Sequence, residues 1–186
     1  MKDIKSRLID AAVETFAQYG VKKTAMADIA ESAGVSRQSL YANFENKDEM
    51  LAAAMTSVVD DIVNSLQLQW KECTSVEQKL TVYFDTAIIG VFDMLQSKPD
   101  AKDILRGVGE LSQKVAKDAD KKKTRILAAQ LMPHAEQLAS AGTTPTALAQ
   151  FIVATSSNLK FSVASRRELV ALLRTLQQSV LAMTSS

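Results

Sequence analysis

Histidine and cysteine, the side chains most often used as metal ligands and catalytic nucleophiles, each occur only once in this chain of 186 residues. The single cysteine, Cys73, excludes a disulfide within the chain and fits a reducing compartment such as the cytoplasm. The sequence has no glycine-rich phosphate loop, and His134 stands outside any metal-ligand spacing. We therefore expect no enzymatic activity, no catalytic residue, no metal and no cofactor.

Long apolar runs, proline and aromatic residues are also scarce. No apolar stretch approaches the roughly 18 residues of a membrane span. The first residues carry acids where a signal peptide would have an apolar core. With 3 prolines, 6 glycines, 5% aromatic and 47% hydrophobic residues, the composition favours helices around a substantial core. We expect an all-α, cytoplasmic protein of about nine helices, without membrane association.

The most informative segment spans residues 24–51 and reads TAMADIAESAGVSRQSLYANFENKDEML. Its pattern predicts two short helices, over residues 25–33 and 37–43, with Gly34 supplying the positive φ of a tight turn. Thr24 and Ser36 are expected to cap these helices, because their hydroxyls can accept from free amides of the first turn. Leu40 and Phe44 are expected to point inward. Such a pair is typical of a helix-turn-helix that enters a major groove of DNA.

This segment resembles the N-terminal signature of TetR-family transcriptional regulators. The resemblance covers roughly the first quarter of the chain. Asn43 departs from the histidine often found in that family, and Gln38-Ser39 depart from a common Gly-Thr pair. The residues that carry the resemblance are Thr24, Ile29, Ala30, Ala33, Gly34, Val35, Ser36, Leu40, Tyr41, Phe44, Lys47 and Leu51. The resemblance implies DNA binding, whereas the departures leave the bound base sequence open.

The second short helix is expected to supply most of the DNA contacts. Arg37 and Gln38 can bond guanine or adenine bidentately, and Ser39 can reach a base or a sugar edge. Thr24, Tyr41 and Lys47 are expected at phosphates. The full predicted set is Thr24, Ser36, Arg37, Gln38, Ser39, Tyr41, Asn43 and Lys47. The first 50 residues hold seven basic and eight acidic side chains, which gives a net charge of −1. DNA binding must therefore depend on where the basic side chains lie and not on the total charge.

A capping box at Asn46 and Glu49 opens a long helix. We expect this helix to join a DNA-binding domain over residues 1–47 to a regulatory domain over residues 48–186. Apolar residues of the second domain are candidate lining of an effector pocket, although for each single residue packing in a plain core is the stronger interpretation. These residues are Trp70, Tyr83, Phe84, Phe92, Met94, Met132 and Phe161. Sparse charge on these helices favours an uncharged or hydrophobic effector, and residues 120–124 (DKKKT) are expected to be a solvated helical stretch or a mobile loop.

The chain ends in two predicted helices that each have apolar residues along one side. The first begins at Thr144 and Pro145, and the second begins at Ser165. TetR-like proteins usually dimerise by pairing such helices into a four-helix bundle, so the resemblance implies a homodimer. The expected interface residues are Leu148, Ile152, Thr155, Leu159, Leu169, Leu172, Leu173, Leu176 and Val180.

The sequence thus predicts a transcriptional repressor that binds a near-palindromic operator in double-stranded DNA. An unidentified small-molecule effector is expected to release it. The alternative is a TetR-like DNA-binding protein that acts through a protein partner instead of an effector.

Overall fold

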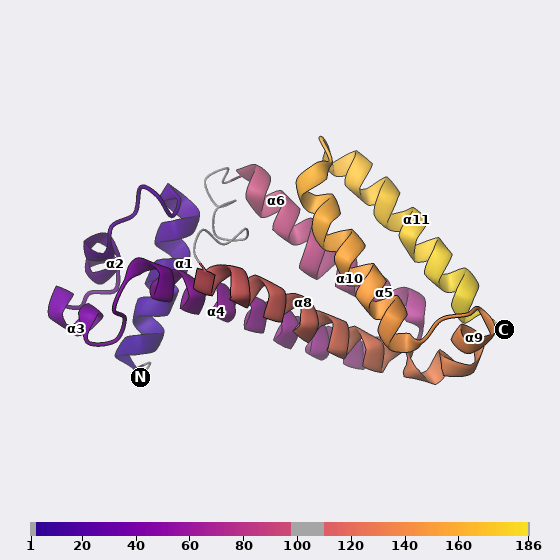
Figure 1. Cartoon of the computed structure of the whole chain (residues 1–186). Helices are drawn as coiled ribbons and strands as arrows, with labels where there is room; N and C mark the ends of the chain where they lie inside the picture. Colours follow the sequence, from indigo (N-terminus) through magenta and orange to yellow (C-terminus); the bar gives the residue numbers. More distant parts are fainter. Residues whose placement is uncertain (1–2, 98–109, 186) are drawn as a thin grey trace. The chain divides into compact units, whose positions relative to one another are not determined.

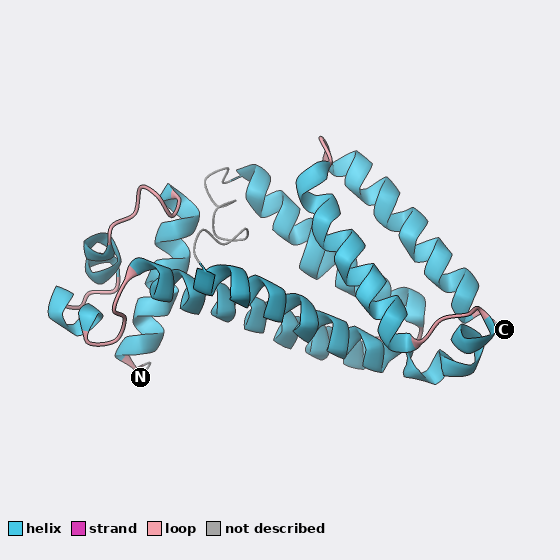
Figure 2. Cartoon of the chain, viewed as in Figure 1, coloured by secondary structure: helices cyan, strands magenta, loops and turns pink. Residues whose placement is uncertain are grey.

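The computed structural model describes residues 3–97 and 110–185, and every regular element in these ranges is helical (Figure 2). The α-helices are α1 (Ile4–Tyr19), α2 (Met26–Ser32), α3 (Arg37–Tyr41), α4 (Lys47–Gln69), α5 (Val76–Phe84), α6 (Gly90–Ser97), α8 (Glu110–Leu131), α9 (Ala135–Ser140), α10 (Pro145–Ser162) and α11 (Arg166–Thr184). Short 3-10 helices at Trp70–Glu72 and Met132–His134 follow α4 and α8, and a π-helical turn at Asp85–Ile89 joins α5 to α6. The all-α prediction is confirmed.

The chain forms two compact units. The first consists of residues 1–61 and 94–119, and the second of residues 62–93 and 120–186. α4, α6 and α8 each contribute residues to both units. The predicted division at residue 47, between a DNA-binding and a regulatory domain, does not coincide with a boundary of the compact units. It stays a prediction.

In the first unit, α1, α2 and α3 form a small head (Figure 1). Asp3 caps α1, its carboxylate accepting from the amide of Ser6 at 2.7 Å. Leu8 and Phe16 on one face of α1 are fully buried, and Gly20 ends the helix with φ 80°. The side chains at the two ends of the helix, such as Tyr19, lie exposed. The head therefore has an apolar core that fixes the position of its short helices.

In the second unit, Ser75 caps α5. The amide of Gln78 donates to Ser75 Oγ at 3.2 Å, and the amide of Thr74 donates to Gln78 Oε1 at 2.8 Å. α5, the π-helical turn and α6 then form one run from residue 76 to residue 97. Gly90 suits this run, because a Cβ there would lie 3.2 Å from the carbonyl oxygen of Asp85. The side chains at the centre of this run are buried: Leu80, Tyr83, Phe84, Ile88, Phe92 and Leu95.

α10 and α11 begin at the predicted caps. Thr144 Oγ1 accepts from the amide of Ala147 at 3.2 Å, and Ser165 Oγ accepts from the amide of Glu168 at 3.2 Å. Large apolar side chains of both helices are buried in the second unit, among them Ile152, Leu169 and Val180.

This burial corrects most of the predicted dimer contacts. Within the protomer, Leu148, Ile152, Leu169, Leu173, Leu176 and Val180 are buried, Thr155 and Leu159 are half-buried, and Leu172 is exposed. A side chain that packs in its own protomer has no surface left for a second copy. Among residues 3–97 and 110–185, no helix combines the length and the apolar character needed to cross a bilayer.

Candidate nucleic-acid interface

α2 and α3 meet at the predicted turn. Gly34 has φ 63°, and the amide of Val35 donates to the carbonyl of Ala30 at 3.0 Å. Ser36 caps α3 as predicted, its Oγ accepting from the amide of Ser39 at 3.1 Å. A glycine relieves the strain of positive φ, and the cap satisfies an otherwise free amide. These local bonds set the direction in which α3 leaves the turn.

α3 is amphipathic over only a few residues. Leu40 and Phe44 are 0% and 2% exposed, so this side of the helix is anchored in the head. Arg37 and Gln38 are exposed, Ser39 is half-buried, and Tyr41 is 55% exposed. The polar and aromatic side chains therefore share the outer side of a helix whose inner side is fixed by two apolar anchors.

Two predicted contact residues are partly committed to bonds inside the head. Asn43 is half-buried, and its Nδ2 donates to the carbonyl of Ser39 at 2.8 Å. Its Oδ1 is an acceptor that this bond leaves unused. Lys47, at the start of α4, donates from Nζ to the carbonyl of Lys22 at 3.4 Å. The ammonium of Lys47 thus lies beside the loop that follows α1.

Thr24 has a different place from the one expected. It is 2% exposed, and its hydroxyl donates to the carbonyl of Gly20 at 2.8 Å. The N-cap of α2 is Ala25, whose amide donates to the Asp28 carboxylate at 2.7 Å. The cap prediction for Thr24 is wrong, because its buried hydroxyl bonds backward to the end of α1. That hydroxyl does not join the exposed surface of α3.

Arg7 has a role that sequence reasoning missed. Its Nη2 donates to the carbonyl of Ala33 at 2.6 Å and to the carbonyl of Gly34 at 3.3 Å. These carbonyls end α2 and enter the turn, where a helix has no acceptor partners of its own. Arg7 therefore ties α1 to the turn, and Lys5 lies over the ring of Phe44 at 5.6 Å from its centroid. The only feature of the sequence that could have predicted this role of Arg7 is that the carbonyls at the end of α2 need a hydrogen-bond donor.

Arg7→Ala is expected to destabilise the protein by about 1 kcal/mol, because two carbonyls lose a charged donor. It should also weaken DNA binding at every base position alike, since it loosens the turn rather than a base contact. Arg7→Lys should recover part of both losses. Urea unfolding and binding titrations with systematically varied duplexes measure the two effects. Arg125→Ala, an exposed arginine of α8, is the control; a base-specific loss in Arg7→Ala would contradict this role.

The predicted effector residues differ in burial and in the compact unit to which they belong. Trp70, Tyr83, Phe84 and Phe92 are buried in the second unit, and Met94 belongs to the first. Phe161 and Met94 are half-buried. Met132 is 59% exposed, so the prediction that it lines a pocket is wrong. It is the first residue of the 3-10 helix Met132–His134, where Pro133 interrupts the α-helix.

Two surface hollows of the second unit include residues of the predicted set. Trp70 borders a hollow of about 620 Å³, but its indole Nε1 already donates to the carbonyl of Lys79 at 3.0 Å. Phe84 borders a groove of about 350 Å³ between α5 and α11. Neither hollow combines the predicted residues.

Known proteins resemble the chain in two ways. Residues 8–54 match the model of the family described as bacterial regulatory proteins, tetR family. The HTH-type transcriptional regulator TtgR of Pseudomonas putida is 40% identical over 57 residues, which cover 31% of this chain and 27% of that protein. The matched segment therefore spans about a quarter of the length of this curated relative. The family match at residues 8–54 contains α2 and α3.

Solved structures share the fold over nearly the whole length. The fatty acid degradation regulator FadR of Bacillus halodurans has a TM-score of 0.71 at 22% identity, covering 100% of this chain and 97% of that one. The transcriptional regulator FadR of Bacillus subtilis, solved in complex with stearoyl-CoA, has a TM-score of 0.58 at 20% identity and covers 97% of each chain. Together with the helix-turn-helix geometry, the match at residues 8–54 identifies this segment as the one shared by bacterial regulatory proteins of the tetR family, and the solved structures show a common fold over the rest of the chain.

Proposed function

We propose that the protein is a sequence-specific DNA-binding repressor that occupies a near-palindromic operator as a homodimer and leaves it when a small-molecule effector binds. One observation carries the proposal: α3 exposes Arg37, Gln38 and Tyr41 while Leu40 holds its other side in the head. A short helix has no packing reason to be so polar and so firmly anchored. A helix that enters the major groove needs both properties.

The contacts follow from the side-chain chemistry. Arg37 and Gln38 reach base edges, and Ser39 reaches a base or a sugar edge. Tyr41 and Lys47 hold phosphates, which fixes the register of the head on the duplex. Ser36 and the free oxygen of Asn43 complete the surface. Thr24 is not part of it, because its hydroxyl is buried.

Arg37→Ala is expected to weaken operator binding by about 1–3 kcal/mol and to relax the preference at one base position, because one bidentate base contact is lost. Binding selection from a randomised duplex library measures the preference, and titration measures the affinity. Lys121→Ala, an exposed basic residue of α8, removes the same charge as a control. An unchanged base preference in Arg37→Ala would contradict the assignment.

The homodimer uses the outward side of α10 and α11. Its uncharged exposed residues are Ala147, Phe151, Ala154, Asn158, Ala171, Leu172, Thr175, Ser179 and Ala182. Phe151 is 55% exposed and Leu172 is 41% exposed. Thr175 and Ser179 direct their hydroxyls to carbonyls of their own helix, at 3.2 and 2.9 Å. Small side chains with two large apolar ones form a surface on which two helix pairs can pack closely.

Release by an effector requires that the effector prefer a form of the dimer that does not fit the operator. α4 is the element available for this coupling, since it begins at Lys47 and contributes residues to both compact units. The stearoyl-CoA complex of one structural relative supports a ligand-binding second unit in this chain. An effector that shifts α4 would change the spacing of the two heads.

The decisive experiment is selection of bound genomic fragments by the purified protein, with and without small molecules extracted from the source cells. We expect a small set of fragments sharing an inverted repeat, and loss of these fragments when the extract contains the effector. Fragments without a shared motif would refute sequence-specific binding. Retention of the fragments with every extract fraction would refute release by an effector.

A further inference from the structure

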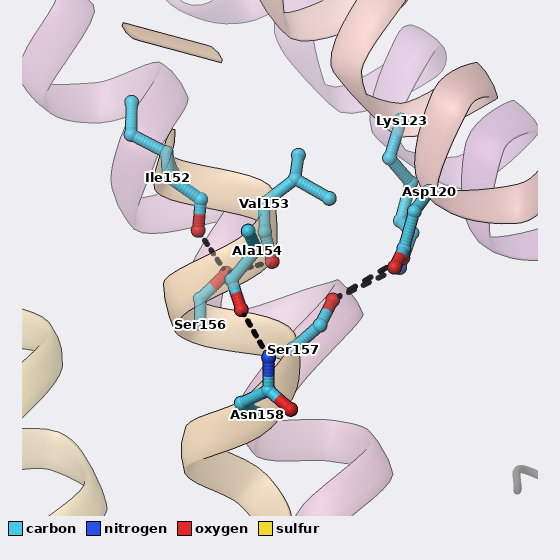
Figure 3. Close-up of polar contacts among 8 residues, drawn as sticks. All are labelled: Asp120, Lys123, Ile152, Val153, Ala154, Ser156, Ser157 and Asn158. Carbon is cyan, nitrogen blue, oxygen red and sulfur yellow. Dashed lines mark hydrogen bonds and ion pairs between the residues drawn. The ribbon is translucent and has the colours of Figure 1, made fainter. Parts of the chain in front are cut away.

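The second unit contains a group of polar side chains where the sequence predicted a solvated stretch or a loop. Lys123 of α8 is only 8% exposed, and its Nζ lies 2.6 Å from Asp120 Oδ1. The same ammonium donates to Ser157 Oγ of α10 at 3.2 Å, and Ser157 donates to Asp120 at 3.4 Å (Figure 3). α8 and α10 are thus joined by a polar contact inside a helical body.

A buried donor without a partner lies close to this contact. Tyr83 of α5 is 0% exposed, and its hydroxyl has no hydrogen-bond partner among the residues that the structure describes. Burial raises the pKa of the Tyr83 phenol, the side chain of Ser156, which lies near the phenol but outside hydrogen-bond geometry, lowers it in part, and the charge of Asp120 raises it further. Ser156 itself donates to the carbonyl of Ile152 at 2.6 Å (Figure 3). Tyr83 therefore keeps its proton and has a hydrogen bond to offer.

Lys160 adds a second cation, four residues after Ser156 on the same side of α10. Desolvation lowers the pKa of Lys160 to about 8, the charge of Lys123 lowers it as well, and Asp120 offsets part of this effect. We name Tyr83, Asp120, Lys123, Ser156, Ser157 and Lys160 the Tyr83 cluster. When both lysines are protonated, its two ammonium groups and one carboxylate leave a net charge of +1.

We propose that the Tyr83 cluster binds the carboxylate of an effector, with the Tyr83 hydroxyl and the two lysine ammoniums as donors. The proposal rests on the proposed function, in which an effector enters the second unit. The ligand must be an acceptor, because a tyrosine hydroxyl that holds its proton and ammonium groups offer donors. A single negative charge balances the cluster, whereas a phosphate dianion would leave an uncompensated charge in a poorly solvated place. The effector is therefore an organic acid with an apolar body, and not the uncharged molecule that the sequence favoured.

Calorimetric titration of the full chain with simple acids tests the site. The probes are benzoate and hexanoate, benzamide and hexanamide as uncharged analogues of the same shape, and phenyl phosphate. We expect the two carboxylates to bind at least about tenfold more tightly than the amides and than phenyl phosphate. Equal binding of amide and acid would overturn the proposal, as would preferred binding of phenyl phosphate or no binding of any probe.

Three variants locate the binding. Tyr83→Phe removes one oxygen that has no partner among the described residues, so the fold should keep its thermal stability while carboxylate binding falls about tenfold. Lys160→Met removes one charge and should produce a similar loss. Lys121→Met, an exposed lysine of the same α8 helix, should leave binding unchanged. Undiminished binding in both folded Tyr83→Phe and Lys160→Met would place the carboxylate elsewhere and overturn the proposal.

Proton uptake gives a second readout. A bound anion favours protonated Lys160, so its pKa must rise from about 8 on binding. At a pH about one unit above that value, binding should therefore take up a proton. Titrations in two buffers of different ionisation enthalpy measure this uptake, and it should vanish in Lys160→Met. No uptake in the native protein would contradict a carboxylate at Lys160.

The operator experiment separates this proposal from the function on which it rests. If an extract fraction releases the operator equally well from the native protein and from Tyr83→Phe, the effector function holds and the Tyr83 cluster is not its site. If carboxylates bind at the cluster but no fraction releases the operator, effector release fails while the site stands.

Discussion

Replacing Phe151 and Leu172 together by arginine is expected to turn the dimer into a monomer and to weaken operator binding by about a hundredfold to a thousandfold. These residues are the largest apolar side chains on the outward side of α10 and α11, at 55% and 41% exposure. In a dimer their burial would favour association, whereas two arginines facing two more would repel each other without solvent to separate them. Sedimentation velocity measures the mass, and titration of a two-half-site duplex measures the affinity.

The loss of affinity follows from the loss of linkage between the heads. Once one head is bound, the other is held close to its half-site, and a monomer loses this effective concentration. Leu68→Arg is the matched control, because Leu68 is 66% exposed in the second unit but lies on α4. The double variant should bind a single half-site as well as the native protein does. A dimer that persists in the double variant would rule out this side of α10 and α11 as the interface.

Phe44→Ala is expected to destabilise the head by about 3–5 kcal/mol, the range for removal of a buried aromatic side chain. Phe44 is 2% exposed, and it anchors the end of α3 together with Leu40. Since whole domains are stable by only about 5–15 kcal/mol, such a loss should leave the head largely unfolded near its melting range and remove specific DNA binding. Hydrogen exchange of amides in α1, α2 and α3 measures the opening of the head.

The second unit supplies an internal reference for this experiment. Trp70 is the only tryptophan of the chain, and it is buried in that unit, so its fluorescence reports unfolding away from the head. Tyr41→Ala is the control, since Tyr41 is 55% exposed and its loss should weaken DNA binding without increasing exchange. Native-like protection of the α3 amides in Phe44→Ala would show that Leu40 alone holds the helix.

The sequence predicted best those features that depend on neighbouring residues alone. Ser36, Thr144 and Ser165 all cap helices as expected, because a hydroxyl three residues before a free amide needs no distant partner. Thr24 fits the same pattern, yet its hydroxyl donates to the carbonyl of Gly20. A hydroxyl can accept or donate, and burial against α1, which the local pattern does not contain, decides between the two.

The dimer surface and the Tyr83 cluster show what periodicity leaves open. A stripe of leucines marks the side of a helix that is buried, but not whether its own chain or a second copy covers it. In α10 and α11 that stripe is buried by other helices of the same chain. The residues that face outward are mostly small and therefore give little hydrophobic signal in the sequence. Similarly, three successive lysines on an α-helix must point in three directions. Lys123 is the one that points inward, and only the position of α10 shows this.

The shortness of α3 has a consequence for changing the DNA sequence that the proposed interface would bind. A helix of 5 residues cannot persist by itself, so its shape depends on Ser36, Leu40 and Phe44. Arg37 and Gln38 extend from the exposed side of the helix and take no part in that support. The residues that choose a DNA sequence can therefore be exchanged in combination while the scaffold is inherited unchanged, which makes these two positions a natural library for new binding preferences.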